Sequence, residues 1–197
     1  MKKLLVVMLS LMMVFAMCAC GAKEEEPSGV ANPVHECTAE EMLEVTGFEL
    51  AAPEGAENAA CAYIEIENEE PIAQLSFTLD GNEFCYRAQS TGATSIMSVK
   101  EEDEYTSIED LTAALNDGTQ IGAKLSGLNY EWSACATVDV DYCEGICAWN
   151  EGEAGFITWL DVAPGVLYSL GMNNGCNQEL LMSTAESIFV PVQGNAG

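Results

Sequence analysis

Apolar and polar positions alternate with a period of two over several stretches of the chain, which is the pattern of half-buried β-strands. The clearest example surrounds Asp80-Gly81, a dipeptide that favours a two-residue hairpin turn. Setting Leu79 opposite Asn82 places apolar residues opposite one another along one face of the hairpin. The resulting pairs are Phe77 with Phe84, Leu75 with Tyr86, and Ala73 with Ala88. Turn and pattern therefore predict the same register.

The same alternation predicts about seven strands. They span residues 61–67, 72–79, 82–88, 130–140, 145–150, 156–162 and 166–172. Helical spacing appears instead in three short stretches, at Thr38 to Thr46, Ser107 to Leu115 and Asn177 to Phe189. The first begins with a capping box, in which Glu41 follows an N-cap Thr38 by three residues. The expected fold class is α+β: a curved antiparallel β-meander with N-terminal, middle and C-terminal helices packed on it.

The N-terminus has the pattern of a lipoprotein signal peptide rather than of a folded element. Lys2 and Lys3 precede a charge-free apolar run that ends near Cys18, which is shorter than a membrane-spanning helix requires. Two cysteines compete as the lipidation site. Cys20 is preferred because the small Ala19 precedes it and Gly21 follows, whereas bulky Met17 precedes Cys18. Acyl chains on Cys20 would hold the protein at the extracytoplasmic face of the cell membrane.

These patterns divide the chain into four expected parts. Residues 1–19 form the signal peptide, and residues 20–33 form a lipidated tether and acidic flexible spacer with few large apolar side chains. Residues 34–192 form a single extracytoplasmic α+β domain, and residues 193–197 form a disordered tail.

Charge narrows the range of partners. The chain has 32 acidic and only six basic side chains, which gives a formal net charge of -26. Such a surface repels phosphate backbones, so nucleic acid is not expected as a partner. The charge favours cations and basic peptides, and it also serves solubility in a crowded cell envelope.

Cysteine is the most unusual part of the composition. Seven cysteines follow Cys20, namely Cys37, Cys61, Cys85, Cys135, Cys143, Cys147 and Cys176. Export favours disulfides, and an odd number leaves at least one thiol unpaired. Cys143 and Cys147, expected to span a turn into a strand, are predicted as the closest pair. Cys61 and Cys85 are expected on one face but two strands apart, roughly 9 to 10 Å, which exceeds the reach of a disulfide.

No residue pattern predicts a catalytic, cofactor or metal site. His35 is the only histidine, so triad chemistry and most zinc sites lack their usual base or ligand. The Cys143-Glu-Gly-Ile-Cys147 spacing differs from the C-x-x-C of thiol oxidoreductases. Asp139-Val-Asp141 could contribute to calcium binding, but the distal Glu of an EF-hand is absent. The sequence therefore predicts a protein that is not an enzyme.

Several short motifs along residues 32–190 carry a family resemblance. They are Asn32-Pro33, Glu44 to Phe48, Ala52 to Glu57, Tyr86-Arg-Ala88 with Thr91, Tyr130-Glu-Trp132, and Ala163 to Leu170. This set resembles uncharacterised small lipoproteins of Gram-positive anaerobes that carry a domain of unknown function, and is similar to the C-terminal domain of some anti-sigma-factor-like membrane proteins. The resemblance implies a curved antiparallel sheet and assigns no catalytic residues. The seven cysteines depart from the family pattern.

Two functions are consistent with these observations. The first is a non-enzymatic binding or sensing module for a peptide, lipid or envelope protein, held on the membrane by its lipid anchor. On that hypothesis, aromatic side chains such as Trp149, Trp159 and Tyr168 are core residues, or line an apolar groove if one face of the sheet is uncovered. The alternative is a cysteine-based metal-binding or redox-active envelope protein.

Overall fold

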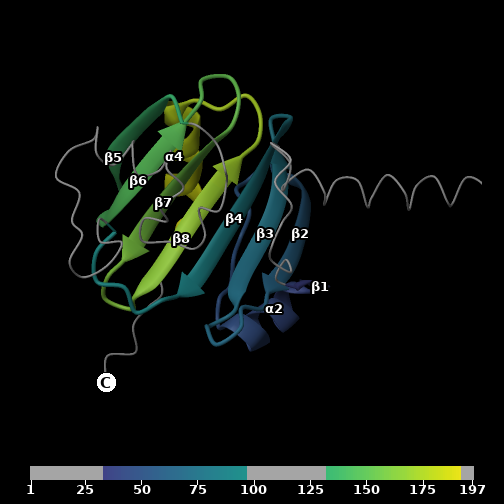
Figure 1. Ribbon diagram of the computed structural model, residues 1–197. Coiled ribbons are helices and arrows are strands. Elements are labelled where there is room, and N and C mark those ends of the chain that lie inside the picture. The colour runs from purple at the N-terminus through teal and green to yellow at the C-terminus, as the bar shows by residue number, and fades with distance from the viewer. Residues whose placement is uncertain (1–32, 97–131, 192–197) are drawn as a thin grey trace, which may run out of the picture.

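The structure, a computed structural model, describes residues 33–96 and 132–191. Within these ranges the chain forms an eight-stranded antiparallel sheet with two helices (Figure 1). The elements are β1 (Val34–Cys37), α2 (Ala39–Thr46), β2 (Glu57–Ile64), β3 (Ile72–Leu79), β4 (Asn82–Ser90), β5 (Ala134–Val140), β6 (Cys143–Trp149), β7 (Gly155–Asp161), β8 (Val166–Met172) and α4 (Gln178–Ile188). Strand order is β1-β2-β3-β4-β8-β7-β6-β5, so two meanders join where β4 pairs with β8.

The predicted hairpin register is confirmed in β3 and β4. Leu79 lies opposite Asn82, and the pairs that follow are Phe77 with Phe84, Leu75 with Tyr86, and Ala73 with Ala88. Asp80 and Gly81 both have positive φ angles, as a two-residue turn between twisted strands requires. Because turn and alternation act within a short segment, local sequence is sufficient to determine this part of the sheet.

The N-terminal helix begins and ends as predicted. The Thr38 hydroxyl accepts a hydrogen bond from the backbone N–H of Glu41 (3.2 Å), and the Glu41 carboxylate accepts one from the backbone N–H of Thr38 (2.8 Å). Gly47 ends the helix in the left-handed region, at φ 76°. At the other end of the chain, Asn177 caps α4 by accepting from the N–H of Leu180 (2.8 Å). The predicted middle helix at Ser107 to Leu115 lies outside the described residues.

The prediction of seven strands is wrong, because the sheet has eight. The missed strand is β1, a four-residue edge strand that follows directly on the predicted spacer. Several predicted boundaries also differ: β2 begins at Glu57, four residues earlier than expected, β5 begins at Ala134, and β6 begins at Cys143. The positions of Cys61 and Cys85 differ too. Cys61 is opposite Leu75 and Cys85 is opposite Ser76, so the two cysteines lie on opposite faces.

The two faces of the sheet differ in what lies against them. On the helix face, Leu75, Tyr86, Trp159 and Tyr168 form a core with Met42 of α2 and with Leu181, Ala185 and Ile188 of α4. Both helices are behind the sheet in the view of Figure 1. The opposite face, here called the Arg87 face, carries a second apolar cluster, which lies mainly on β6 to β8 and also includes Ile64 of β2 and Ile72 of β3. Its members include Ile146, Phe156, Leu160 and Leu167, together with Ile96 and Trp132.

Loss of the α2 capping box gives the first testable result. Replacing Thr38 with alanine is expected to lower the free energy of unfolding by about 1 kcal/mol, measured by urea titration. Serine at this position should keep most of the stability that the cap provides. The hydrogen bonds from Thr38 hold the pKa of the Glu41 carboxyl below its ordinary value of 4.5. The contribution of the ionised Glu41 carboxylate to the capping box is therefore present above pH 4.5 and is lost as the pH falls through the lowered pKa, whereas the bond from the Glu41 N–H to the Thr38 hydroxyl does not titrate. Equal stability of the alanine variant at pH 7 would contradict the capping role.

Candidate functional site

Two sequence-predicted features bear on membrane attachment. The predicted lipidation residue, Cys20, lies outside the described residues. Within residues 33–96 and 132–191, no helix is long and apolar enough to cross a membrane.

The structure does not bring Cys143 and Cys147 together. Both lie on β6, because the strand begins at Cys143 instead of at Gly145. Residues four apart on a strand are separated by about 13 Å, well beyond the roughly 7 Å that a disulfide allows between Cα atoms. A disulfide between them does not fit this strand. Burial, the main cause, raises the pKa of each thiol to about 12, so both are inert core residues at neutral pH.

The aromatic side chains considered for a groove are mostly core residues. Trp159 is fully buried and stacks on Tyr168 at a centroid distance of 5.6 Å, and Phe189 contacts both rings edge-on. Trp132 is buried on the Arg87 face, against Phe156. A binding function therefore has to be sought among the polar residues of the sheet.

A row of polar side chains crosses the Arg87 face where four central strands pair. Gln74 of β3 lies opposite Arg87 of β4, Arg87 opposite Ser169 of β8, and Ser169 opposite Thr158 of β7. We call these four residues the polar row. Gln74, Ser169 and Thr158 are each less than a tenth exposed, and Arg87 is half-buried. The row exists because Gln74 and Arg87 occupy the alternate positions to Leu75 and Tyr86, which point into the helix-face core.

Arg87 makes a single hydrogen bond within the described part of the chain. Its Nε donates to the Gln74 side-chain oxygen at 2.9 Å. A guanidinium has five N–H donors in a planar fork that matches a carboxylate, so the described residues use only a small part of its donor capacity. No carboxylate of residues 33–96 or 132–191 lies within ion-pair distance of it; the pair found there is His35 with Glu65.

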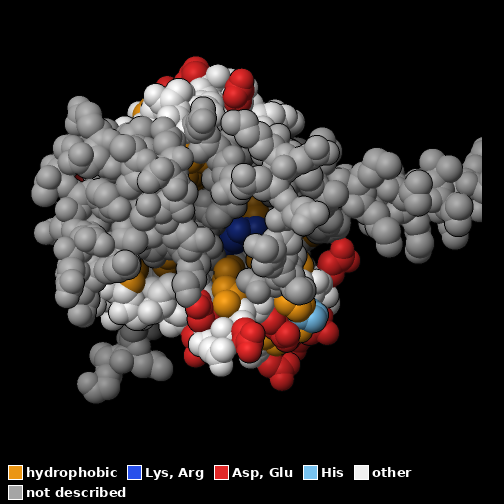
Figure 2. Space-filling model, viewed as in Figure 1, with side chains coloured by type: hydrophobic (Ala, Val, Ile, Leu, Met, Phe, Trp, Pro, Cys, Tyr) orange, Lys and Arg blue, Asp and Glu red, His pale blue; other side chains and the backbone are white. Residues whose placement is uncertain are grey.

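The charge of Arg87 is isolated in an acidic molecule. It is the only Lys or Arg among the described residues, since Lys2, Lys3, Lys23, Lys100 and Lys124 lie outside them. Figure 2 views this face and shows basic side-chain atoms near its centre, with acidic side chains toward the edges. A half-buried cation whose donors are mostly unused by the described residues is an arrangement that can bind an anionic group at short range.

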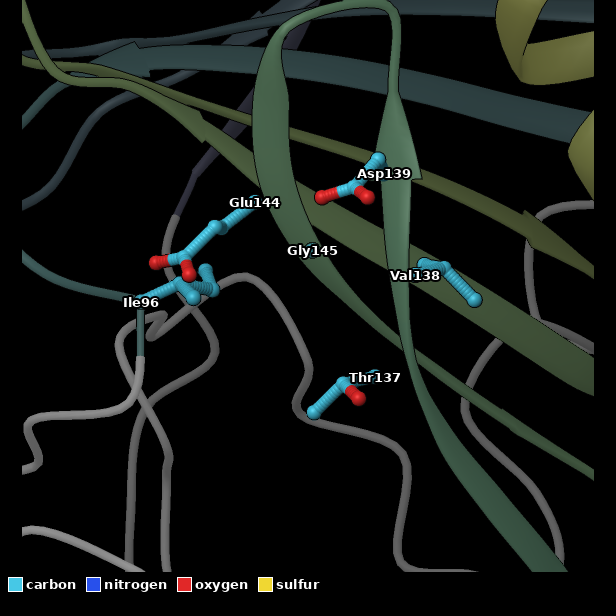
Figure 3. Close-up of a pocket in the computed structure, with 6 residues that line it drawn as sticks. All are labelled: Ile96, Thr137, Val138, Asp139, Glu144 and Gly145. Atoms are coloured by element: carbon cyan, nitrogen blue, oxygen red, sulfur yellow. The ribbon is translucent and has the colours of Figure 1, made fainter.

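A second hollow lies beside the β5–β6 hairpin (Figure 3). Asp139 and Glu144 face each other across the two strands, and Ile96 and Thr137 complete much of the lining. The volume is about 260 Å³, below the roughly 300 Å³ at which small-molecule sites begin. Among the described residues, no group of three or more His, Cys, Asp or Glu is placed to hold a metal ion. The polar row is therefore the better candidate site.

Sequence reasoning did not identify the polar row. The alternation of side chains along β4 places Arg87 on the face opposite to that of Tyr86. This alternation is the sequence signal that could have pointed to Arg87 as a member of the polar row. Gln74 lies opposite Arg87 in the same hairpin, whereas Ser169 of β8 and Thr158 of β7 come more than 70 residues later in the chain and depend on the β4–β8 pairing.

The fold and the polar row define an α+β protein whose described residues form an eight-stranded antiparallel sheet with one cationic side chain, Arg87, on a face of it. No family model, curated protein or solved structure matches this chain.

Proposed function

We propose that this protein is a non-enzymatic envelope lipoprotein that binds a peptide through the polar row. It is held at the extracytoplasmic face of the cell membrane by acyl chains on Cys20, and belongs with the small lipoproteins whose motifs it resembles. The basic n-region, the apolar run and the Ala19-Cys20-Gly21 sequence support the anchor. The isolated guanidinium of Arg87 carries the binding function.

The position of Arg87 favours a carboxylate as the group that it binds. The side chain is half-buried, its Nε is held by Gln74, and the hydroxyls of Ser169 and Thr158 lie along the same row. Fixing one edge of the guanidinium leaves the other edge oriented for a bidentate pair with two oxygens. Thr158 donates its hydroxyl to the backbone oxygen of Tyr168 (2.8 Å), so it supports the strand and is not itself a free donor.

Net charge selects among molecules that carry a carboxylate. A chain with a formal charge of -26 repels polyanions at long range and attracts basic peptides. A basic peptide with a free C-terminus satisfies both conditions, because its body is steered by the acidic surface and its carboxylate pairs with Arg87. Capture of a C-terminal carboxylate is an established mode of peptide recognition.

Retention of peptides by the immobilised full chain tests this function. We expect a library of basic hexapeptides with free C-termini to be retained, and the same library with amidated C-termini to bind about tenfold less. Replacing Arg87 with glutamine is expected to remove this difference, because a charge-assisted hydrogen bond contributes about 1.5 to 3 kcal/mol. Lysine at the same position should restore part of it, since it keeps the charge but not the planar fork.

A matched variant separates the site from the overall charge. Ser183→Glu on the exposed side of α4 makes the net charge more negative by one unit, as Arg87→Gln does, but lies on the helix face. It should bind free-acid and amidated peptides as the unmodified protein does. Equal retention of the two libraries by the unmodified protein would overturn the proposal.

A further inference from the structure

Cys37 and Cys61 form a cross-strand pair at the edge of the sheet. Cys37 is the last residue of β1 and lies directly opposite Cys61 of β2. Four pairs further back, the N–H of Glu65 donates to the oxygen of Pro33 (3.1 Å), which makes that pair a hydrogen-bonded one. Such pairs recur at every second position, so Cys37 and Cys61 occupy one as well, with Cα atoms about 5.5 Å apart. Disulfides are found at Cα separations of about 4.4 to 6.8 Å.

The two side chains share one face and one environment. Both point to the helix face, because Cys61 lies opposite Leu75, and both are half-buried against the edge of that core. Burial raises the pKa of both thiols; for Cys37, the neighbouring Cys61 and Glu41 raise it further. The effect of Cys61 on Cys37 is a second sign that the sulfurs are close. Each thiol is thus accessible to a reagent and mainly protonated at neutral pH.

None of the other described cysteines both lies opposite a second cysteine and is accessible to a reagent. Cys143, Cys147 and Cys176 are buried in the core. Cys85 and Cys135 are half-buried like Cys37 and Cys61, but both lie on the Arg87 face, opposite Ser76 and Ala148. Among the described residues, direct opposition of two cysteines in neighbouring strands occurs at Cys37 and Cys61.

We propose that Cys37 and Cys61 are a disulfide-forming site that fastens the edge strand β1 to the sheet. The reaction is thiol–disulfide exchange with a small-molecule or protein disulfide as oxidant. The thiolate of one cysteine attacks a sulfur of the oxidant, forms a mixed disulfide and releases one oxidant thiolate. The second cysteine, as thiolate, then attacks the mixed disulfide and releases the other oxidant thiolate. Two protein thiols are oxidised and one disulfide of the oxidant is reduced to two thiols.

The bond would stabilise a weak part of the fold. β1 has four residues and one neighbouring strand, β2. Linking residues 37 and 61 closes the loop that contains α2, which restricts the unfolded chain and keeps β1 paired. The proposal concerns the edge strand and does not depend on the binding function of the polar row.

The test exposes the full chain to oxidised glutathione at pH 8 and maps its disulfides by proteolysis and mass spectrometry. We expect a Cys37–Cys61 crosslink to be the main product and the apparent Tm to rise by about 5 to 10 °C, reversed by dithiothreitol. Oxidation should accelerate about tenfold per pH unit from pH 7 to 8, because the attacking thiols have raised pKa values.

Two serine variants provide the controls. Cys61→Ser should form a glutathione adduct at Cys37 and show no rise in Tm, whereas Cys85→Ser should oxidise as the unmodified protein does. Single glutathione adducts on both Cys37 and Cys61 of the unmodified protein, without a crosslink, would overturn the proposal. So would a crosslink that joins either cysteine to a different partner.

Discussion

Replacing Gly155 with alanine is expected to lower the free energy of unfolding by about 3 kcal/mol, near the upper end of the usual cost of overpacking. Gly155 begins β7 on the helix face, opposite Trp149 and Met172. A Cβ at this position would overlap the sulfur of Cys176 and would lie 3.0 Å from both Leu181 Cδ1 and Trp149 Cβ. Because Cys176 and Leu181 are fully buried, neither can move aside without disturbing the packing of α4. Urea titration monitored by tryptophan fluorescence measures the loss.

A neighbouring glycine provides the matched control. Gly171 of β8 lies opposite Phe156, so its Cβ would point to the Arg87 face and meet the Gly155 oxygen at an ordinary 3.8 Å. Alanine at Gly171 is therefore expected to change stability by less than about 1 kcal/mol. Adding Cys176→Ala to the Gly155 variant should recover part of its loss by removing the overlapping atom. An equal loss in both glycine variants, or no recovery in the double variant, would contradict this packing account.

How far the fold follows from the sequence depends on whether the determining contacts are local. The β3–β4 hairpin could be predicted because Asp80-Gly81 and the flanking alternation act within a short segment. The strand β1 could not, because Val34 to Cys37 has no large apolar face and its strand conformation depends on pairing with β2, more than twenty residues away. Missing β1 also removed Cys37 from consideration as a partner of Cys61.

The candidate site also combines a part that local sequence determines with a part that depends on non-local contacts. The position of Arg87 on the face opposite Tyr86 follows from alternation, but its neighbour Ser169 comes from a non-local pairing. The expected pairing of Cys143 with Cys147 failed for a related reason. A turn was assumed between the two residues, whereas the chain turns at Asp141 and Tyr142 and is already extended at Cys143. A two-residue shift of a strand boundary was therefore enough to misplace the pair.

Stability is expected to fall steeply above pH 9 because of three buried thiols. Burial, the main cause, raises the pKa of Cys143, Cys147 and Cys176 from an ordinary 9.0 to about 12. Their raised folded-state pKa values mean that the unfolded chain loses these protons first. The stabilisation is complete below pH 9 and is lost as the pH rises toward 12. Each thiol contributes a loss of about 1.4 kcal/mol per pH unit, so the three together remove about 4 kcal/mol per unit.

Unfolding by urea at pH 8, 9, 10 and 11 measures this loss, and two comparisons isolate its cause. A fall of about 4 kcal/mol per unit is comparable with the whole stability of a typical domain, so the protein should unfold without denaturant before pH 12. A variant with alanine at Cys143, Cys147 and Cys176 should lose stability less steeply, with buried Tyr86 and Tyr168, whose pKa values are also raised by burial, accounting for the remainder. Repulsion between the carboxylates and surface groups that become negative above pH 9 gives a different result, because 0.5 M potassium chloride screens surface charges but not buried thiols. An alkaline loss that disappears in salt and persists in the alanine variant would assign the effect to surface charge and contradict the role of the thiols.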